Sequence, residues 1–200
     1  MSGPAPRLEE GGTFSRPGYR VRLRPIEERD VDAMMGWVND PAVTRNFAGM
    51  SRTITRQEEL AYVRAMRSSS ADRLYVAEDL DGAYVGNAGI HKIYWPAANG
   101  RLGLVIGDRT RHGQGYGQEV LRLLCTLAFE HLQLHKVWIV HYGDNGRMLH
   151  LCKKLGFQEE GVLRDEYFHQ DAWHDMLRHS LLRGDYDEAP WRARLGQPTM

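Results

Sequence analysis

The amino-acid sequence predicts an α+β fold with a mixed sheet. Strand-like and helix-like hydrophobic patterns follow one another in the order strand, two helices, three strands, helix, strand, helix, strand, strand. That order is typical of α+β domains. A length of 200 residues fits one domain with a sizeable core. A glycine-rich run at residues 111–118, between a strand-like and a helix-like segment, is the most informative stretch for function.

The first half of the chain begins with a segment rich in Gly and Pro. Residues 1–17 are therefore predicted to form a flexible arm ahead of a domain at 18–187. Residues 18–25 alternate apolar and charged side chains, as a half-buried strand does. Two short helices are expected at 27–39 and 56–68, around a turn at Asp40-Pro41. Strands at 74–78 and 84–94 are expected to pair as a hairpin, with Asp81-Gly82 as the turn.

The second half continues with a strand at 101–107 that enters the glycine run. Apolar residues then recur at helical spacing, which predicts a helix at 119–132 with one buried face. A β-branched stretch at 137–142 predicts a strand, and a short helix at 147–155 should end at Gly156. Late strands are expected at 167–168 and 176–182. The chain is polar from 185 onward, and residues 188–200 are assigned to a C-terminal tail.

Composition excludes several classes of function. Lys+Arg and Asp+Glu number 26 each, so no basic face for nucleic acid is expected. No apolar run approaches the roughly 18–20 residues that span a bilayer, and the N-terminus lacks the apolar core of a signal peptide. Cys125 and Cys152 both fall in helix-like patterns and form no disulfide framework, which favours the reducing cytoplasm.

Nine histidines raise the question of a metal site. The closest pair at helical spacing is His131 and His135. No Cys-x-x-Cys motif, His-Glu-x-x-His motif or carboxylate partner completes that pair, so no metal site is predicted.

The glycine run predicts a phosphate pocket. Gly113, Gly115 and Gly117 stand at alternate positions before a helix, where glycine allows positive φ and close approach of a ligand. The N–H groups of the first helical turn bind anions. A dinucleotide fingerprint would need a third glycine where Gln118 stands and an acidic residue about 20 positions later on a following strand. Neither is present.

Further segments give the run a context. The first is the strand 102–108 with the turn and helix start at 112–119, and the second is 132–137 with the strand at 138–142. The third is Asn145 with 154–157, and the fourth is 160–164 with Asp175 downstream. Residues 37–43, near the start of the chain, are a further such segment. With these segments, about residues 20 to 185 resemble the GNAT superfamily of N-acetyltransferases. The resemblance is strongest to the branch that holds ribosomal-protein, polyamine and amino-sugar acetyltransferases.

The resemblance implies a single domain with a mostly antiparallel sheet flanked by helices. A splayed strand pair, 104–106 and 137–142, would hold the acyl-coenzyme A co-substrate. The implied coenzyme A residues are Val105, Ile106, His112, Gly113, Gln114, Gly115, Tyr116, Gly117, Gln118 and Asn145. His112 departs from the Gln or Arg usual in the family. Asn145 could equally cap the helix that follows it.

The implied reaction is transfer of an acetyl group from acetyl-CoA to a primary amine, by direct attack in a ternary complex. Many relatives place a proton-donating tyrosine where this chain has Cys152. That thiol could donate a proton, or it could pack in the core with Met148, Leu151 and Leu155. The leading candidate for the general base is His141, followed by Glu78, His91 and Asp175.

Acceptor contacts are expected at Trp37, Asp40, Tyr94, Trp95 and Asp175. No dense acidic cluster favours a polyamine, so the sequence favours a peptide or protein α-amine, an amino sugar or another small amine. The alternative function is a non-catalytic coenzyme A binding module. The sequence leaves a homodimer open, and no nucleic acid or membrane partner is expected.

Overall fold

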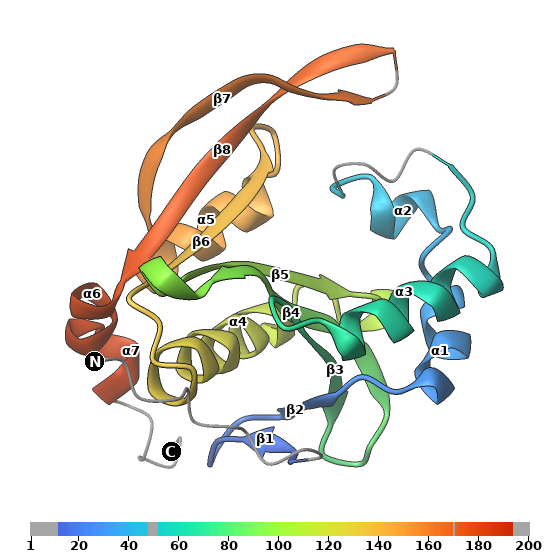
Figure 1. Ribbon diagram of the computed structural model, residues 1–200, viewed down its shortest axis with the longest axis horizontal. Coiled ribbons are helices and arrows are strands. Elements are labelled where there is room, and N and C mark those ends of the chain that lie inside the picture. Colours follow the sequence, from blue (N-terminus) through green and yellow to red (C-terminus); the bar gives the residue numbers. More distant parts are fainter. Residues whose placement is uncertain (1–11, 48–51, 170, 194–200) are drawn as a thin grey trace.

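The computed structural model describes residues 12–47, 52–169 and 171–193. An eight-stranded sheet in the order β1-β2-β3-β4-β5-β6-β8-β7 forms its centre (Figure 1). Every neighbouring pair is antiparallel except β5 and β6, which are parallel. The predicted mixed, mostly antiparallel sheet is thus confirmed.

The strands are β1 (Phe14–Ser15), β2 (Val21–Pro25), β3 (Arg73–Asp79), β4 (Tyr84–Tyr94), β5 (Asn99–Ile106), β6 (Lys136–Tyr142), β7 (Gln158–His169) and β8 (Ala172–Leu182). The helices are α1 (Val31–Met35), α2 (Pro41–Thr44), α3 (Arg56–Ser68), α4 (Tyr116–Thr126), α5 (Gly146–Leu155), α6 (Arg183–Glu188) and α7 (Pro190–Ala193). Short 3-10 helices are η1 (Glu28–Asp30), η2 (Trp95–Ala97) and η3 (Arg109–Arg111), and a π-helical turn, η4 (Leu127–His131), extends α4.

The sheet carries a hydrophobic core on each face. Alternate residues of a strand point to opposite faces, so Leu74 and Val76 of β3 join the core under α1 and α3, while Tyr75 and Ala77 join the core under α4. Several residues of α4 are fully buried in that second core. The two layers of helices fix both faces of β5, the strand that leads into the glycine run.

Strands β5 and β6 pair over only three residues. Asn99, Gly100 and Arg101 oppose residues 136–138, and beyond them β5 pairs only with β4 and β6 only with β8. Figure 1 shows β6 leaving β5 to follow the β7–β8 hairpin. The splayed strand pair that the resemblance implied is therefore present, and it opens toward the C-terminal end of β5.

Both ends of the chain differ from the sequence prediction. Phe14 and Ser15, inside the predicted flexible arm, pair with β2. At the other end, α6 and α7 occupy the stretch predicted to be polar. Tyr186 is fully buried, and Trp191 of the predicted tail donates its indole N–H to the Leu155 carbonyl at 3.1 Å. The rest of the arm (1–11) and of the tail (194–200) lies outside the described residues.

Several boundaries also moved. The helix predicted at 27–39 is divided into η1 and the short α1, followed by turns. The helix predicted at 119–132 begins earlier, at Tyr116, and ends in the π-helical turn. The strands expected at 167–168 and 176–182 are parts of a much longer hairpin, β7 and β8. No helix in the described part of the chain is long and apolar enough to cross a membrane.

Candidate functional site

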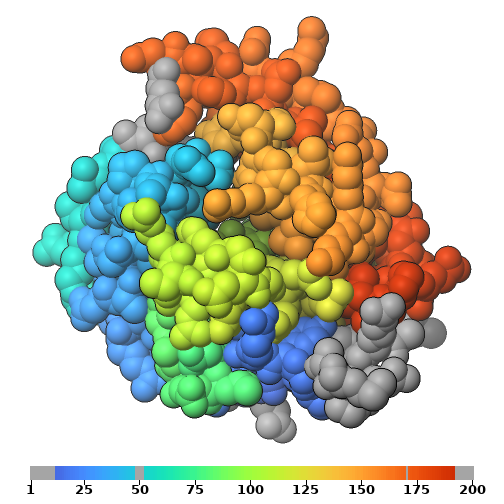
Figure 2. Space-filling model, turned by 180° about the vertical axis from the view of Figure 1, so that it is seen from behind, coloured from blue at the N-terminus to red at the C-terminus, as the bar shows by residue number. Residues whose placement is uncertain are grey.

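A pocket lies where β5 and β6 diverge. Four segments line it: 42–47 around α2, 104–106 at the end of β5, 111–117 in the glycine run, and 145–151 at the start of α5. Figure 2 shows the hollow from behind, between the blue surface of α2, the yellow-green glycine run and the orange start of α5. The splay thus supplies the space, and the glycine run forms one of its walls.

The glycine run presents free N–H groups to this pocket. Gly113 and Gly115 have φ of +74° and +90°, a left-handed conformation that glycine adopts without steric cost. Gly115 is the N-cap of α4. The N–H groups of Gly113, Gly115, Tyr116 and Gly117 find no hydrogen-bond acceptor within the described residues, and all four residues line the pocket. This arrangement can bind an anionic group.

Side chains on both sides hold the turn in place. Arg111 pairs with Asp79 at 2.7 Å, and the Arg20 guanidinium donates to the Gln114 carbonyl at 2.9 Å. His112 Nε2 lies 2.7 Å from the Ile106 carbonyl. Because a carbonyl only accepts, Nε2 must carry the proton of that bond. His112, which departs from the family pattern, therefore links the turn to the end of β5. This hydrogen bond and the two arginine contacts hold the turn in its conformation before any ligand binds.

Hydrogen bonds also lower the pKa of the Asp79 carboxyl. The largest contribution is the N–H of Ala83, and Arg111 adds to it. Asp79 therefore stays ionised as the partner of Arg111 at any pH near neutrality. The anchor that positions the glycine run does not depend on pH in that range.

Not all ten predicted coenzyme A residues face the pocket. Gln114 and Gln118 are not among the residues that line it. The Tyr116 phenol is buried between the guanidinium groups of Arg20 and Arg111, whose carbons lie 4.6 and 5.1 Å from the ring centre. Tyr116 therefore offers its backbone rather than its side chain to the pocket.

Asn145 lines the pocket and also caps α5. Its Oδ1 accepts the N–H of Met148 at 3.1 Å. Both of the roles considered for Asn145 are thus compatible with its position, because capping occupies only the oxygen of the amide.

Sequence reasoning missed two features of the pocket. One is its apolar wall, to which Val43 and Phe47 near α2 and Met148 and Leu151 on α5 contribute. The other is Arg147, which lines the pocket and makes no ion pair with the described residues. An apolar face on a short helix is indistinguishable from ordinary core packing in sequence, so only the fold reveals that wall.

The structure does not bring the five predicted acceptor residues together, and none of them lines the pocket. Trp37 is a core residue, since its indole packs so closely on Gly107 that a Cβ there would lie 2.3 Å from it. Asp40 caps α2 by accepting the N–H of Ala42. Trp37 and Asp40 therefore have structural roles.

The other three acceptor candidates lie elsewhere on the sheet. Tyr94 and Trp95 sit beside the start of β5, at the closed end of the splay and away from the glycine run. Asp175 is exposed on β8, where its carboxylate accepts the N–H of Asp165. Tyr94 and Trp95 thus lie away from the pocket at the glycine run, and their contact with an acceptor stays a prediction.

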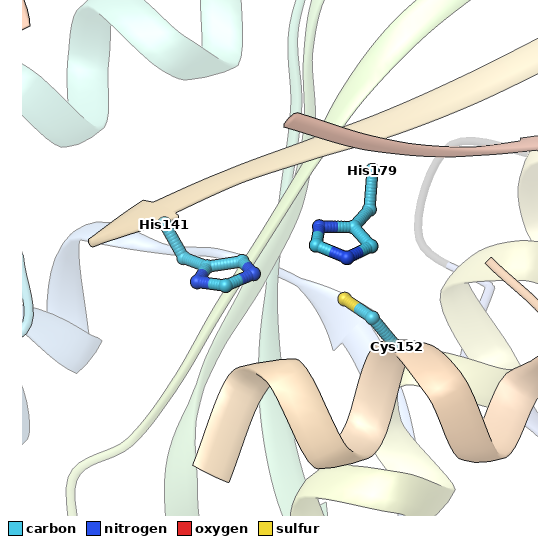
Figure 3. A group of neighbouring side chains, drawn as sticks. All are labelled: His141, Cys152 and His179. Atoms are coloured by element: carbon cyan, nitrogen blue, oxygen red, sulfur yellow. The ribbon is translucent and has the colours of Figure 1, made fainter. Parts of the chain in front are cut away.

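The two predicted catalytic residues are buried outside the pocket lining. Cys152 is fully buried on α5 and His141 is 3% exposed on β6. Burial raises the pKa of the Cys152 thiol to about 12. A thiol with a raised pKa donates a proton poorly, and Cys152 is not among the residues that line the pocket, so its position opposes the role of general acid. Figure 3 shows the two side chains facing each other and a third, His179 of β8.

The other candidate bases are also engaged. Glu78 accepts from Arg22 and Arg24 at 2.7 and 2.8 Å. His91 Nδ1 lies 3.2 Å from an Asp72 oxygen, and burial lowers the pKa of His91 below its ordinary value. Neither lines the pocket.

Comparison with known proteins identifies the family. Residues 20–158 match the family model of the acetyltransferase (GNAT) domain. The chain is 24% identical over 170 residues to the N-acetyltransferase p20 of Bacillus licheniformis, covering 84% of this chain and 95% of that protein. It is likewise 24% identical over 169 residues to spermidine N(1)-acetyltransferase of Escherichia coli K12, covering 84% and 89%.

Among solved structures, spermidine N-acetyltransferase from Vibrio cholerae in complex with CoA and spermine superposes with a TM-score of 0.78. The identity is 22%, and the match covers 84% of this chain and 98% of that one. The fold is therefore the GNAT fold. The chain belongs to the GNAT acetyltransferase family, and it is an enzyme that acetylates an amine from acetyl-CoA.

Proposed function

We propose that the pocket at the glycine run binds acetyl-CoA with its pyrophosphate at the start of α4. The observation that carries this proposal is the set of free N–H groups of Gly113, Gly115, Tyr116 and Gly117 along the pocket wall. Partial positive charge at the helix start adds to these donors. Arg147 supplies a cation on the opposite wall.

The splay supports the path of the acyl-pantetheine arm. From Leu102 onward, β5 has no strand on the side that faces β6, so the backbone groups of that edge are available to the amides of the arm. The Ile106 carbonyl is already bonded to His112. The arm therefore pairs with β5 before Ile106, and the apolar side chains of Met148 and Leu151 pack against it from α5.

Positioning supplies most of the rate in this proposal. A thiolate leaves a thioester readily, so holding a neutral amine against the carbonyl is the main requirement. The amine attacks the acyl carbon directly, the C–S bond breaks, and the amine proton passes to water or a nearby base. No covalent acyl-cysteine is formed, because the Cys152 thiol is buried outside the pocket.

The proposed acceptor is a small primary amine that is cationic in solution. Curated relatives that align with most of this chain are named spermidine N(1)-acetyltransferases. Asp144 precedes the pocket residue Asn145, and the Asp175 carbonyl accepts the N–H of Gly143 at 3.3 Å. The backbones of both acidic residues thus lie near the C-terminal end of β6, although neither side chain lines the pocket, and their negative charge would attract a cationic amine toward that end of the molecule.

The test is release of coenzyme A from acetyl-CoA over a panel of acceptors: spermidine, glucosamine and a short peptide with a free α-amine. The highest kcat/KM is expected with a small amine, at least about tenfold above the peptide, a difference of about 1.4 kcal/mol in transition-state binding. A higher value with the peptide would refute the assignment of the acceptor. Tight acetyl-CoA binding without turnover on any amine would instead favour the alternative, a non-catalytic coenzyme A binding module.

A further inference from the structure

Three side chains converge inside the C-terminal half of the molecule. His141 comes from β6, His179 from β8 and Cys152 from α5, and one ligand atom of each lies within 4.8 Å of the others. Figure 3 shows the sulfur pointing at both imidazole rings. The two rings stack with their centres 5.1 Å apart, and all three residues are buried. This group, His141, Cys152 and His179, is called the HCH cluster below.

The imidazoles of the HCH cluster lack the partners that buried nitrogens require. His141 Nε2 and both nitrogens of His179 are buried without a hydrogen bond to the described residues. Leaving a buried polar group unpaired costs roughly 1–3 kcal/mol. Unpaired imidazole nitrogens beside a buried thiol are therefore costly as plain core packing, and an ion bound among the three side chains would satisfy one nitrogen of each ring.

His141 is already set in the form that binds a metal ion. Its Nδ1 lies 2.8 Å from the Tyr142 carbonyl, which only accepts, so Nδ1 carries the proton. The lone pair is then on Nε2, which faces the cluster. A backbone carbonyl that orients the far nitrogen of a ligating histidine is a common feature of metal sites.

Glu159 stands behind the second histidine. Its carboxylate lies 3.8 Å from His179 Nε2 and is half exposed. At that distance the carboxylate makes no hydrogen bond to the imidazole, but a small shift would let it orient one nitrogen of His179, as carboxylates do in carboxylate–histidine–zinc arrangements. Lys153 is the nearby cation that acts on His179, and it lies on the surface of α5.

We propose that the HCH cluster binds one zinc-class transition-metal ion through the Cys152 thiolate and one nitrogen each of His141 and His179. Two imidazoles and one thiolate suit a borderline ion of this kind and provide three of four tetrahedral positions. Ligand atoms bound at about 2.0–2.3 Å lie closer together than the present limit of 4.8 Å, so small side-chain shifts close the site. Coordination replaces the S–H bond by an S–metal bond and releases one proton to solvent.

The ion would have a structural role, as a cross-link between elements of the fold (the clamp), and would not line the pocket. It would join α5, β6 and β8 on the far side of the splay. Leu151 of the pocket wall precedes Cys152 in the same helix, so the clamp would also fix that wall. No metal site was predicted from the sequence, because only histidines at helical spacing were compared. His141, Cys152 and His179 come from three different elements, and they meet only because β6 pairs with β8 and α5 packs beside them.

The test uses the full-length protein after chelator treatment. It is titrated with Co²⁺ as a spectroscopic stand-in for Zn²⁺, both in the folded state and during refolding from denaturant, so that slow entry into a buried site cannot hide binding. One Co²⁺ per chain is expected, with an intense near-ultraviolet band from thiolate-to-cobalt charge transfer and the visible bands of tetrahedral cobalt. Zn²⁺ should displace Co²⁺ and raise the Tm.

Variants separate this site from accidental binding. Cys152→Ala should abolish the thiolate band, and His141→Gln and His179→Gln should each weaken Zn²⁺ binding by at least about tenfold. Cys125→Ala, at the other buried cysteine, and His150→Gln, at an exposed histidine of the same helix, should leave the spectrum unchanged.

Two results would overturn the proposal. One is a wild-type protein, folded by circular dichroism, that shows no thiolate band after refolding with Co²⁺. The other is Zn²⁺ binding of equal affinity in wild type and Cys152→Ala, which would place the ion on other residues. Neither result bears on acetyl-CoA binding, so the proposed function is tested separately. The wild-type spectrum decides the question even if a variant fails to fold.

Discussion

The buried carboxylates in one half of the sheet are paired, whereas the buried imidazoles in the other half are largely unpaired. In the first half, β1 to β5, the buried carboxylates of Asp30, Glu78 and Asp79 each pair with an arginine. In the second half, β6 to β8, the imidazoles of His141 and His179 are buried without hydrogen-bond partners for most of their nitrogens. The pocket lies at the boundary, where the halves separate.

This difference indicates where the cost of burying ionisable groups is met by pairing within the chain. Paired groups in the first half repay the cost of burial within the chain. Unpaired groups in the second half are stable only if something outside the chain satisfies them or if other packing offsets their cost. The first half therefore holds the glycine run with charge pairs of its own, and the second half contains the unpaired imidazoles that a bound ion would satisfy.

The largest expected effect comes from breaking the pairs of the first half. Arg24 binds Asp30 with two nitrogens at 2.7 and 2.8 Å and also contacts Glu78. Arg24→Ala leaves two buried carboxylates without this partner, which typically costs about 3–5 kcal/mol. Thermal unfolding should show a Tm lower by roughly 10 °C for a chain of this size.

Arg56→Ala is the matched control, because Arg56 pairs with Asp32 in a fully solvated setting. Exposed pairs contribute little to stability, so its Tm should stay close to that of the wild type. Equal losses in the two variants would contradict the view that burial gives the Arg24 network its importance.

The next effect concerns the boundary between the halves. Gly115→Ala places a Cβ at φ +90° and 3.2 Å from the Arg20 guanidinium. The turn must shift, and the N–H groups of the glycine run lose their alignment with the phosphate. Hydrogen bonds to charged groups contribute about 1.5–3 kcal/mol each, so calorimetry should show acetyl-CoA affinity reduced by more than about tenfold.

Gly82→Ala controls for backbone strain alone. Gly82 has a similar φ of +87° in the β3–β4 turn, and a Cβ there meets only ordinary contacts. Its stability should fall as much as that of Gly115→Ala, with unchanged affinity for acetyl-CoA. A loss of affinity in both variants would show that general destabilisation, rather than the turn, controls binding.

A smaller effect is expected from a histidine of the first half. Burial is the main reason that the pKa of His91 lies below 6.5, and the opposing attraction of Asp72 does not restore it. The unfolded chain then binds a proton at higher pH than the folded chain. Stability is therefore fully present above about pH 6.5 and falls as the pH decreases below it.

Urea unfolding at pH 7.5 and pH 5.5 measures this contribution. His91→Gln should reduce the loss of unfolding free energy between these pH values, by no more than about 1.4 kcal/mol per pH unit. His150→Gln, at an exposed site, should leave the pH dependence as in the wild type. Identical pH dependence in His91→Gln and wild type would show that His91 does not contribute to the loss of stability at low pH.

The sequence predicted those elements whose signals are local. Helix α3 is observed over Arg56–Ser68, the predicted range, because Thr55 and Glu58 form a capping box at its start. The β3–β4 hairpin follows the Asp81-Gly82 turn, and Gly156 ends α5 with φ +86°. Each of these features depends on a few adjacent residues, which a single sequence displays directly.

Features that depend on distant contacts were missed. Strand β7 has no fully buried residue along its length, so its hydrophobic pattern is weak and only two of its residues were predicted. Tyr186 and Trp191 bury themselves in a stretch that is polar on average. The acceptor residues were expected to meet because the resemblance implied it, but the register of β4 and β5 places Tyr94 at the closed end of the splay.

The smallest predicted effect concerns Arg147, on the wall of the pocket that α5 of the second half contributes. Arg147 lines the pocket from the first turn of α5 and has no ion pair in the part of the chain that the structure describes. An exposed charge pair contributes about 0.2–1 kcal/mol and is screened by salt. Arg147→Ala should therefore weaken acetyl-CoA binding about two- to threefold at low salt, and the difference should shrink at high salt. Lys154→Ala, on the same helix but away from the pocket, should bind like the wild type at both salt concentrations. If Arg147→Ala retained wild-type affinity at low salt, the second half would contribute only apolar contacts to the bound coenzyme.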